Sequence, residues 1–68
     1  MSIARTTEIK SSSATSFDEA IKKGIARAVK TLKNVSGAWI ENQELLIDSK
    51  GKISEYRVQM KITFILEE

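Results

Sequence analysis

The spacing of the apolar residues changes once along the chain, and this change limits what the chain can fold into. From Phe17 to Leu32, apolar or small residues recur every three or four positions, which is the pattern of an amphipathic helix with one buried stripe. After Gly37 the period becomes two, and the alternation from Lys52 to Leu66 is clean enough to predict a long strand with one apolar face. One helix must therefore pack on one face of a sheet.

The helix has a recognisable start. Ser16 and Glu19 fit a capping box, in which the Ser16 hydroxyl accepts the Glu19 amide and the Glu19 carboxylate reaches back to Ser16. The predicted buried stripe consists of Phe17, Ala20, Ile21, Gly24, Ile25, Ala28, Val29 and Leu32. The opposite face is basic, with Lys22, Lys23, Arg27, Lys30 and Lys33. We expect residues 34–37 to end the helix.

Three strands accompany this helix. Alternation predicts a short strand over residues 3–9, followed by a small-polar connector over 11–15. A second strand covers 38–47, a turn with Gly51 covers 48–51, and the third strand covers 52–66. One face of the last strand carries Tyr56, Val58, Met60, Ile62, Phe64 and Leu66, and the other carries Arg57, Gln59, Lys61 and Thr63. The predicted fold is therefore α+β: a single β-α-β-β domain over 1–68, with a three-stranded antiparallel sheet partly wrapped around one helix.

Composition excludes several kinds of protein. A chain of 68 residues buries a marginal core, and without cysteine it has no disulfides to compensate, so we expect oligomerisation. The absence of cysteine and histidine also excludes the usual zinc sites and the nucleophile schemes built on those residues. With no Gly-rich phosphate loop and no acids that spacing forces together, we expect no enzyme.

The charge pattern argues against nucleic acid or a membrane as a partner. The net charge is +2, and the basic helix face has no interleaved aromatic residues, so we interpret it as a solvated face. No apolar run approaches the ~20 residues that span a bilayer, and the first residues have no apolar signal region. A cytoplasmic location is the expectation.

Trp39 is the single tryptophan, and its position does not fit a core pattern. In a strand of period two its face also carries the polar residues Glu41 and Gln43, whereas the opposite face carries Ala38, Ile40 and Leu46. Two interpretations stay open at this point. Trp39 is either a core or subunit-contact residue, or a stacking platform for a planar heteroaromatic ligand.

The whole pattern resembles the dodecin family over about residues 3–67. The resemblance lies in the element order and in five segments: Ser16-Phe17, residues 20–28, Trp39-Ile40-Glu41, residues 56–62 and residues 64–67. It implies a hollow homododecamer with sheets inside and helices outside. It also implies flavin (FMN or riboflavin) bound in pairs near two-fold axes, with each ring stacked on the tryptophan that Trp39 matches. The implied role is non-enzymatic storage and photoprotection, because electron transfer from indole quenches the flavin.

Arg57 departs from the family pattern. Dodecins usually have at this position a glutamine that contacts the pyrimidine edge of the flavin, and a guanidinium donates hydrogen bonds but accepts none. Gln59 lies on the same strand face and can substitute for the glutamine. The predicted flavin-binding residues are therefore Trp39, Arg57, Gln59, Gln43 and Glu41.

A calcium-binding branch of the same family supplies the alternative. Its hairpin is similar to residues 48–53 followed by Tyr56-Arg57, so Arg57 favours calcium where Trp39 favours flavin. A shell of this kind binds calcium or other ions in place of flavin. Subunit interfaces could then gather Glu8, Glu41, Glu44 or Glu55 into a cation site.

Overall fold

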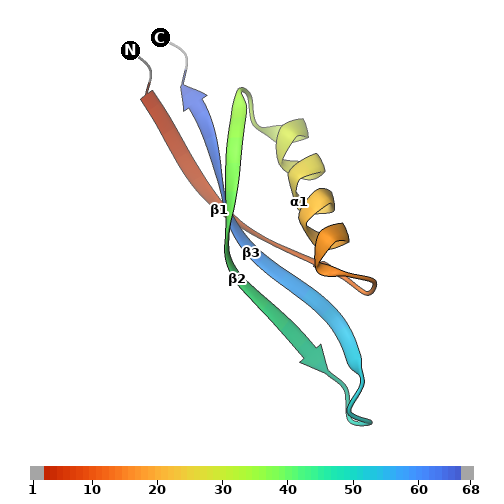
Figure 1. The fold of residues 1–68 in the computed structure, drawn as a ribbon. Helices are drawn as coiled ribbons and strands as arrows, with labels where there is room; N and C mark the ends of the chain where they lie inside the picture. The colour runs from red at the N-terminus through yellow and green to blue at the C-terminus, as the bar shows by residue number, and fades with distance from the viewer. Residues whose placement is uncertain (1–2, 67–68) are drawn as a thin grey trace.

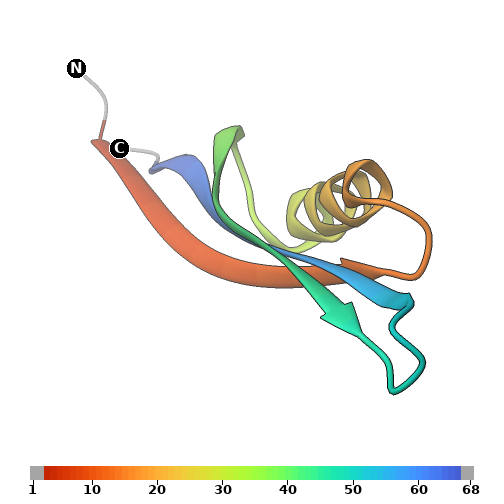
Figure 2. The ribbon, with the colours of Figure 1, turned by 60° about the horizontal axis from the view of Figure 1, so that its bottom comes forward.

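The computed structural model describes residues 3–66, which form strand β1 (Ile3–Ser13), helix α1 (Phe17–Thr31), strand β2 (Val35–Ile47) and strand β3 (Ile53–Leu66) (Figure 1). The sheet order is β1-β3-β2, and β3 runs antiparallel to both neighbours. The sheet curves, with α1 on its inner side (Figure 2). The predicted β-α-β-β fold with a three-stranded antiparallel sheet and one helix is confirmed.

The core lies between α1 and the apolar face of β3. Val58, Met60 and Ile62 are fully buried and pack with Ala20 and Ala28 of the helix. The predicted alternation of β3 is therefore confirmed where it meets the helix. Partly buried apolar side chains surround this centre: Ile9, Phe17, Ile21, Ile25, Leu32, Val35 and Ile40.

Val29 was predicted in the buried stripe, and that prediction is wrong. Its side chain is 52% exposed. The helix packs mainly on β1 and β3 and less on β2, so Val29, at the edge of the stripe, extends past the covered part of the sheet. Gly24 shows how close the helix comes on its other side. A Cβ atom at Gly24 would lie 3.1 Å from the Ser11 Cβ and would overlap the methyl group of Met60.

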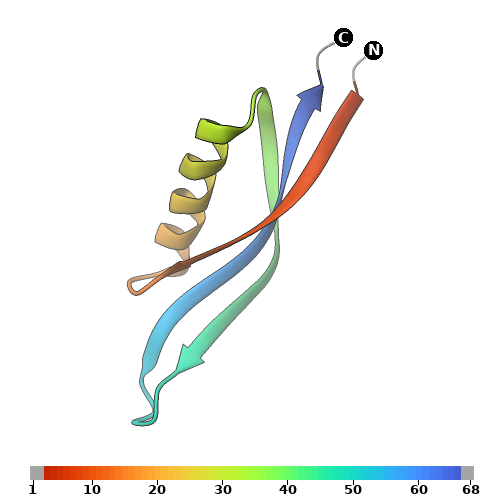
Figure 3. The same ribbon diagram turned by 180° about the vertical axis from the view of Figure 1, so that it is seen from behind.

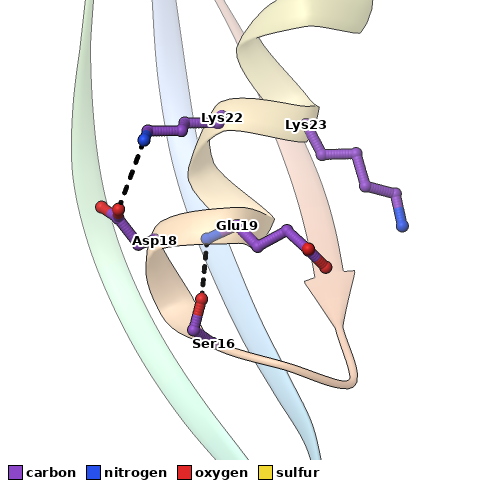
Figure 4. A pocket seen from close by; sticks show the side chains of 5 residues that line it. All are labelled: Ser16, Asp18, Glu19, Lys22 and Lys23. Atoms are coloured by element: carbon purple, nitrogen blue, oxygen red, sulfur yellow. Dashed lines mark hydrogen bonds and ion pairs between the residues drawn. The ribbon is translucent and has the colours of Figure 1, made fainter.

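The helix start contains one confirmed and one incorrect prediction. The Ser16 Oγ accepts the Glu19 backbone N–H at 3.0 Å, as the capping box requires (Figure 4). The Glu19 carboxylate does not return to the Ser16 amide. It accepts a hydrogen bond of 2.5 Å from the hydroxyl of the buried Ser13, and the Ser16 N–H donates to that Ser13 oxygen at 3.4 Å. The bond from Ser13 lowers the pKa of Glu19 below its usual 4.5.

Strand β1 is longer than its sequence predicts. The serines at 11–13 were expected in a connector, but they continue the strand, and Ser11 and Ser13 lie opposite Val58 and Tyr56 of β3. Serine favours turns because its hydroxyl bonds nearby backbone groups. Here the ladder to β3 supplies those backbone partners, so pairing with a distant segment overrides the local preference.

The connection from α1 to β2 is also shorter than expected. Residues 35–37 were expected to end the helix, but they belong to β2. The Leu32 N–H bonds the Ala28 carbonyl at 2.9 Å, and Asn34 makes the reversal with a φ of 60°. Asparagine tolerates this left-handed conformation better than most residues, so no glycine is needed there.

The β2–β3 hairpin extends past the start of the helix (Figures 1 and 3). Its predicted turn is confirmed: one Asp48 carboxylate oxygen accepts the N–H groups of Lys50 and Lys52 at 2.9 and 3.0 Å. Gly51 has a φ of 80°, the conformation that glycine adopts without strain.

Candidate functional site

The face of the sheet opposite α1, called here the polar face, carries cross-strand rows of mostly polar side chains. Each row takes one residue from β2, one from β3 and one from β1. The three central rows are Trp39–Lys61–Glu8, Asn42–Gln59–Lys10 and Glu44–Arg57–Ser12.

Trp39 occupies the first row, as its predicted position opposite the core requires. Its side chain is 50% exposed, an unusual state for the largest aromatic residue of a small domain. The Lys61 ammonium lies 5.7 Å from the centre of the indole ring, and the Glu41 carboxylate lies 3.4 Å from the same ammonium. Glu41 therefore reaches the polar face through Lys61, and the indole keeps a large part of its surface available.

Gln59 uses both ends of its side-chain amide in the second row. Its oxygen accepts from the Asn42 amide nitrogen at 3.4 Å, and its nitrogen donates to the Glu8 carboxylate. The amide thus links all three strands. These bonds lie at an exposed surface, where a ligand can exchange with them at modest cost.

Arg57 is held within its own strand in the third row. Its Nη2 and Nε atoms donate to one oxygen of Glu55 at 2.9 and 3.3 Å, although Glu44 is its direct neighbour across the ladder. About two fifths of the Arg57 side chain stays exposed. Arg57 and Gln59, both predicted, therefore lie beside each other on the polar face.

Gln43 does not join this group. The prediction placed Gln43 on the face of Trp39, but Gln43 pairs with Val58 and lies on the side of the sheet that carries α1. The register shifts between Ile40 and Asn42, which is a β-bulge, and one extra residue reverses the alternation that follows. The same shift places Leu46, predicted with Ile40, opposite Glu55 on the polar face.

Asn42 and Glu44 take the place predicted for Gln43, and sequence reasoning missed both. The signal was present in the apolar residues of the strand. They occupy even positions at Ala38 and Ile40, whereas the apolar residues that end the strand include the odd positions Leu45 and Ile47. A strand whose apolar parity changes contains either a bulge or a twist.

The polar face is hollowed beside Arg57. One hollow of about 60 Å³ is lined by Lys10, Asn42, Glu44, Arg57, Val58 and Gln59, and a second of about 180 Å³ lies between β1 and Arg57. Ligand pockets usually measure ~300–1,000 Å³. One copy of the chain therefore offers part of a pocket, with a ring platform, edge donors and edge acceptors, and not a closed site.

Other candidate features give weaker sites. The hollow at the start of α1 is lined by Ser16, Asp18, Glu19, Lys22 and Lys23, and the Asp18 carboxylate pairs with the Lys22 ammonium at 3.5 Å (Figure 4). Those side chains are exposed and neutralise one another. Within residues 3–66, no three acidic side chains gather closely enough to hold a metal ion. In the same range no helix is long and apolar enough to cross a membrane.

Comparison with known proteins gives one consistent family. The family model described as dodecin matches residues 3–67. A calcium dodecin of Mycobacterium tuberculosis is 30% identical over 64 residues, which cover 94% of this chain and 89% of that protein.

Solved structures agree with this family. The dodecin from Streptomyces davaonensis superposes with a TM-score of 0.90 at 33% identity, covering 98% of this chain and 97% of that one. The calcium dodecin structure from Mycobacterium tuberculosis, described as having a novel calcium-binding site, superposes with a TM-score of 0.81 at 26% identity. That match covers 96% of this chain and 91% of the other.

Proposed function

The chain belongs to the dodecin family, and we propose that it binds and stores flavin without catalysing a reaction on it, inside a self-assembled dodecamer. The observation that carries this proposal is the half-exposed indole of Trp39 on the polar face. A large flat aromatic surface that faces neither the core nor a covering helix suits offset stacking with the isoalloxazine ring.

The neighbours of Trp39 suit the edge of such a ring. Gln59 and Asn42 each offer an amide donor and an amide acceptor, and Arg57 adds donors. Lysine and arginine on these rows alternate with glutamate, so the face carries little net charge. A neutral heterocycle with hydrogen-bonding edges fits this surface better than a compact ion does. We include Trp39, Gln59, Arg57 and Glu41 in the proposed site with Asn42 and leave out Gln43, because it lies on the opposite face.

Assembly is part of the same proposal. A half-exposed indole and a hollow of about 60 Å³ do not enclose a tricyclic ring, so a second copy must complete the pocket. A flavin held against the indole in this way is quenched by electron transfer from the ring. Storage with photoprotection then follows from binding alone, and FMN and riboflavin are the two candidate ligands.

A flavin titration tests the proposal. Purified protein is added to riboflavin or FMN, and flavin fluorescence is followed to saturation, with the particle size measured on the same sample. We expect strong quenching with about one flavin per subunit. Trp39→Ala is expected to remove the quenching and weaken binding by at least tenfold, because aromatic pairs contribute about 1 kcal/mol beyond area burial and the buried area is lost as well.

Val29→Ala is the matched control. Val29 is 52% exposed, close to the 50% of Trp39, but lies on α1 at the other side of the sheet. This variant should bind and quench flavin as the unaltered protein does. Tight, quenched binding by the Trp39→Ala variant would remove Trp39 from the site and the flavin proposal with it.

Calcium binding is the second candidate, and Arg57 favours it. The residue departs from the flavin-contacting glutamine of the family, and the calcium dodecin of Mycobacterium tuberculosis is 30% identical to this chain. Calorimetric titration with CaCl2 separates the two candidates. Calcium binding together with unquenched flavin in a dodecamer-sized particle would replace the flavin proposal with the ion-binding one.

A further inference from the structure

The end of the β2–β3 hairpin carries apolar side chains that nothing in the described chain covers. Residues 45–55, called here the hairpin arm, extend past the start of α1 (Figures 1 and 3). Leu45, Ile47 and Ile53 are 43%, 56% and 45% exposed. Ile47 lies directly opposite Ile53 across the two strands, so the arm presents a cross-strand pair of large aliphatic residues rather than scattered ones.

These side chains lie beyond the last contacts of the core. The core closes at this end where the Phe17 and Tyr56 rings meet edge to face, with centroids 5.2 Å apart. On β2 the last residue that packs on the core is Ile40. The arm therefore adds exposed apolar surface to the molecule without adding to its core.

We propose that the hairpin arm is a self-association surface that a second copy of this chain covers. The inference rests on the self-assembly part of the proposed function and does not depend on flavin. It assigns to Leu45, Ile47 and Ile53 the contact between copies.

Charge selects a second copy over an anionic partner. Residues 44–55 contain three acidic residues and two basic residues, namely Glu44, Asp48, Glu55, Lys50 and Lys52. Helices and arms that bind anionic lipid or nucleic acid are strongly basic, which this arm is not. Both signs in a short segment suit a surface that meets another copy of itself, where each charge finds its opposite.

Backbone geometry points to the same occupant. The order β1-β3-β2 places β2 at an edge of the sheet, so the arm offers an outer row of backbone donors and acceptors beside its apolar side chains. The described chain measures 53 × 19 × 13 Å, and five fully or nearly buried apolar residues form its core. A domain this thin gains the apolar burial that it lacks when copies cover one another.

Particle size in the absence of flavin tests the assignment. Sedimentation velocity over a concentration series compares the unaltered chain with Ile53→Glu, with Val29→Glu as the matched control on α1. We expect Ile53→Glu to raise the concentration at which the assembly dissociates by at least about thirtyfold, the effect of losing one important interface residue. Val29→Glu, at 52% exposure, should assemble as the unaltered chain does. Unaltered assembly of Ile53→Glu, or equal loss in both variants, overturns the proposal.

A second variant decides the case in which Ile53→Glu does not fold. Ile47→Ala shortens an exposed side chain and introduces no charge, so it leaves the core unchanged. We expect a smaller shift of the same sign, and helix content by circular dichroism that recovers as the protein is concentrated. Assembly of Ile47→Ala at the original concentration overturns the proposal. An unaltered chain that is monomeric at all concentrations removes the self-assembly part of the proposed function as well, so the two failures differ.

Discussion

Arg57 is the residue on which the choice between ligands depends. Its guanidinium is neutralised by Glu55 at 2.9 Å and leaves the position with donors alone. The edge of a flavin ring offers carbonyl acceptors and a ring N–H donor, so one of its groups finds no partner at Arg57. Gln59 can supply the missing acceptor, but its oxygen already accepts from Asn42.

Arg57→Gln is therefore expected to tighten flavin binding. The amide adds an acceptor for the ring N–H, and one hydrogen bond of this kind contributes about 1 kcal/mol, which corresponds to roughly fivefold in affinity. Fluorescence titration with riboflavin measures the change. Arg57→Ala serves as control, because it breaks the pair with Glu55 without adding an amide and should give no gain. Weaker binding by Arg57→Gln would mean that the guanidinium itself contacts the ligand.

Single residues also show how far the site follows from the sequence. The sequence predicts the face of Trp39, Arg57 and Gln59 correctly, because β3 is regular there and Trp39 precedes the bulge. It fails at Gln43, because one inserted residue between Ile40 and Asn42 reverses every later side chain of β2. A bulge is a property of two paired strands, and one strand read by itself records it as no more than a change of apolar parity.

At the scale of elements, the start of α1 has a charged group whose protonation affects folding. Ser13, buried under the helix start, donates to the Glu19 carboxylate and lowers its pKa below 4.5. A carboxyl whose pKa is lower in the folded state stabilises the fold fully above its unfolded pKa. That contribution is lost as the pH falls through the lowered, folded value.

Glu19→Gln should reduce the acid sensitivity of the fold. The variant loses the charge-assisted bond from Ser13, so it should be slightly less stable than the unaltered chain at pH 7. From about pH 4.5 downward the difference should shrink, because the unaltered chain then loses the same contribution. Urea unfolding at a series of pH values measures both curves. A constant difference over the whole acid range would contradict the role given to Glu19.

Gly24 fixes the distance between the helix and the sheet. A Cβ atom there would overlap the end of the fully buried Met60 side chain and lie 3.1 Å from Ser11 Cβ. Gly24→Ala should therefore destabilise the fold by about 1–2 kcal/mol, because overpacking outweighs the ~1 kcal/mol that alanine gains over glycine in a helix. Thermal and urea unfolding measure the change. Gly37→Ala is the control, since no atom lies within 4 Å of its Cβ position and the change should be small. A stabilised Gly24→Ala variant would show that Met60 moves freely.

Elements were predicted well in type and less well at their ends. The capping signal at Ser16 and the regular alternation of β3 are local, and both agree with the structure. The serines at 11–13 and the residues at 35–37 join strands because β3 supplies their partners across the sheet. No local pattern contains that information, since the partners lie at least 26 residues away in the sequence.

At the scale of the whole molecule, stability and assembly are expected to be one property. The chain folds into a body of 53 × 19 × 13 Å with two edge strands and a small core, and it contains no cysteine for disulfides. The sequence predicts an oligomer from its length and composition, but the surfaces that meet are visible only in the fold, where α1 leaves the hairpin arm uncovered. If copies stabilise one another, folding free energy must depend on protein concentration.

The thermal midpoint of the unaltered protein should therefore rise with concentration. Each tenfold increase favours the assembled state by about 1.4 kcal/mol per subunit, which in a domain of this size raises the midpoint by roughly 5 °C. Circular dichroism scans over a hundredfold concentration range, without flavin, measure this slope. Ile53→Glu is the matched control, because a chain that no longer assembles should unfold at a lower temperature that does not change with concentration. A constant midpoint in the unaltered chain would mean that one copy folds by itself, and the exposed arm would then have to be stabilised within a single chain.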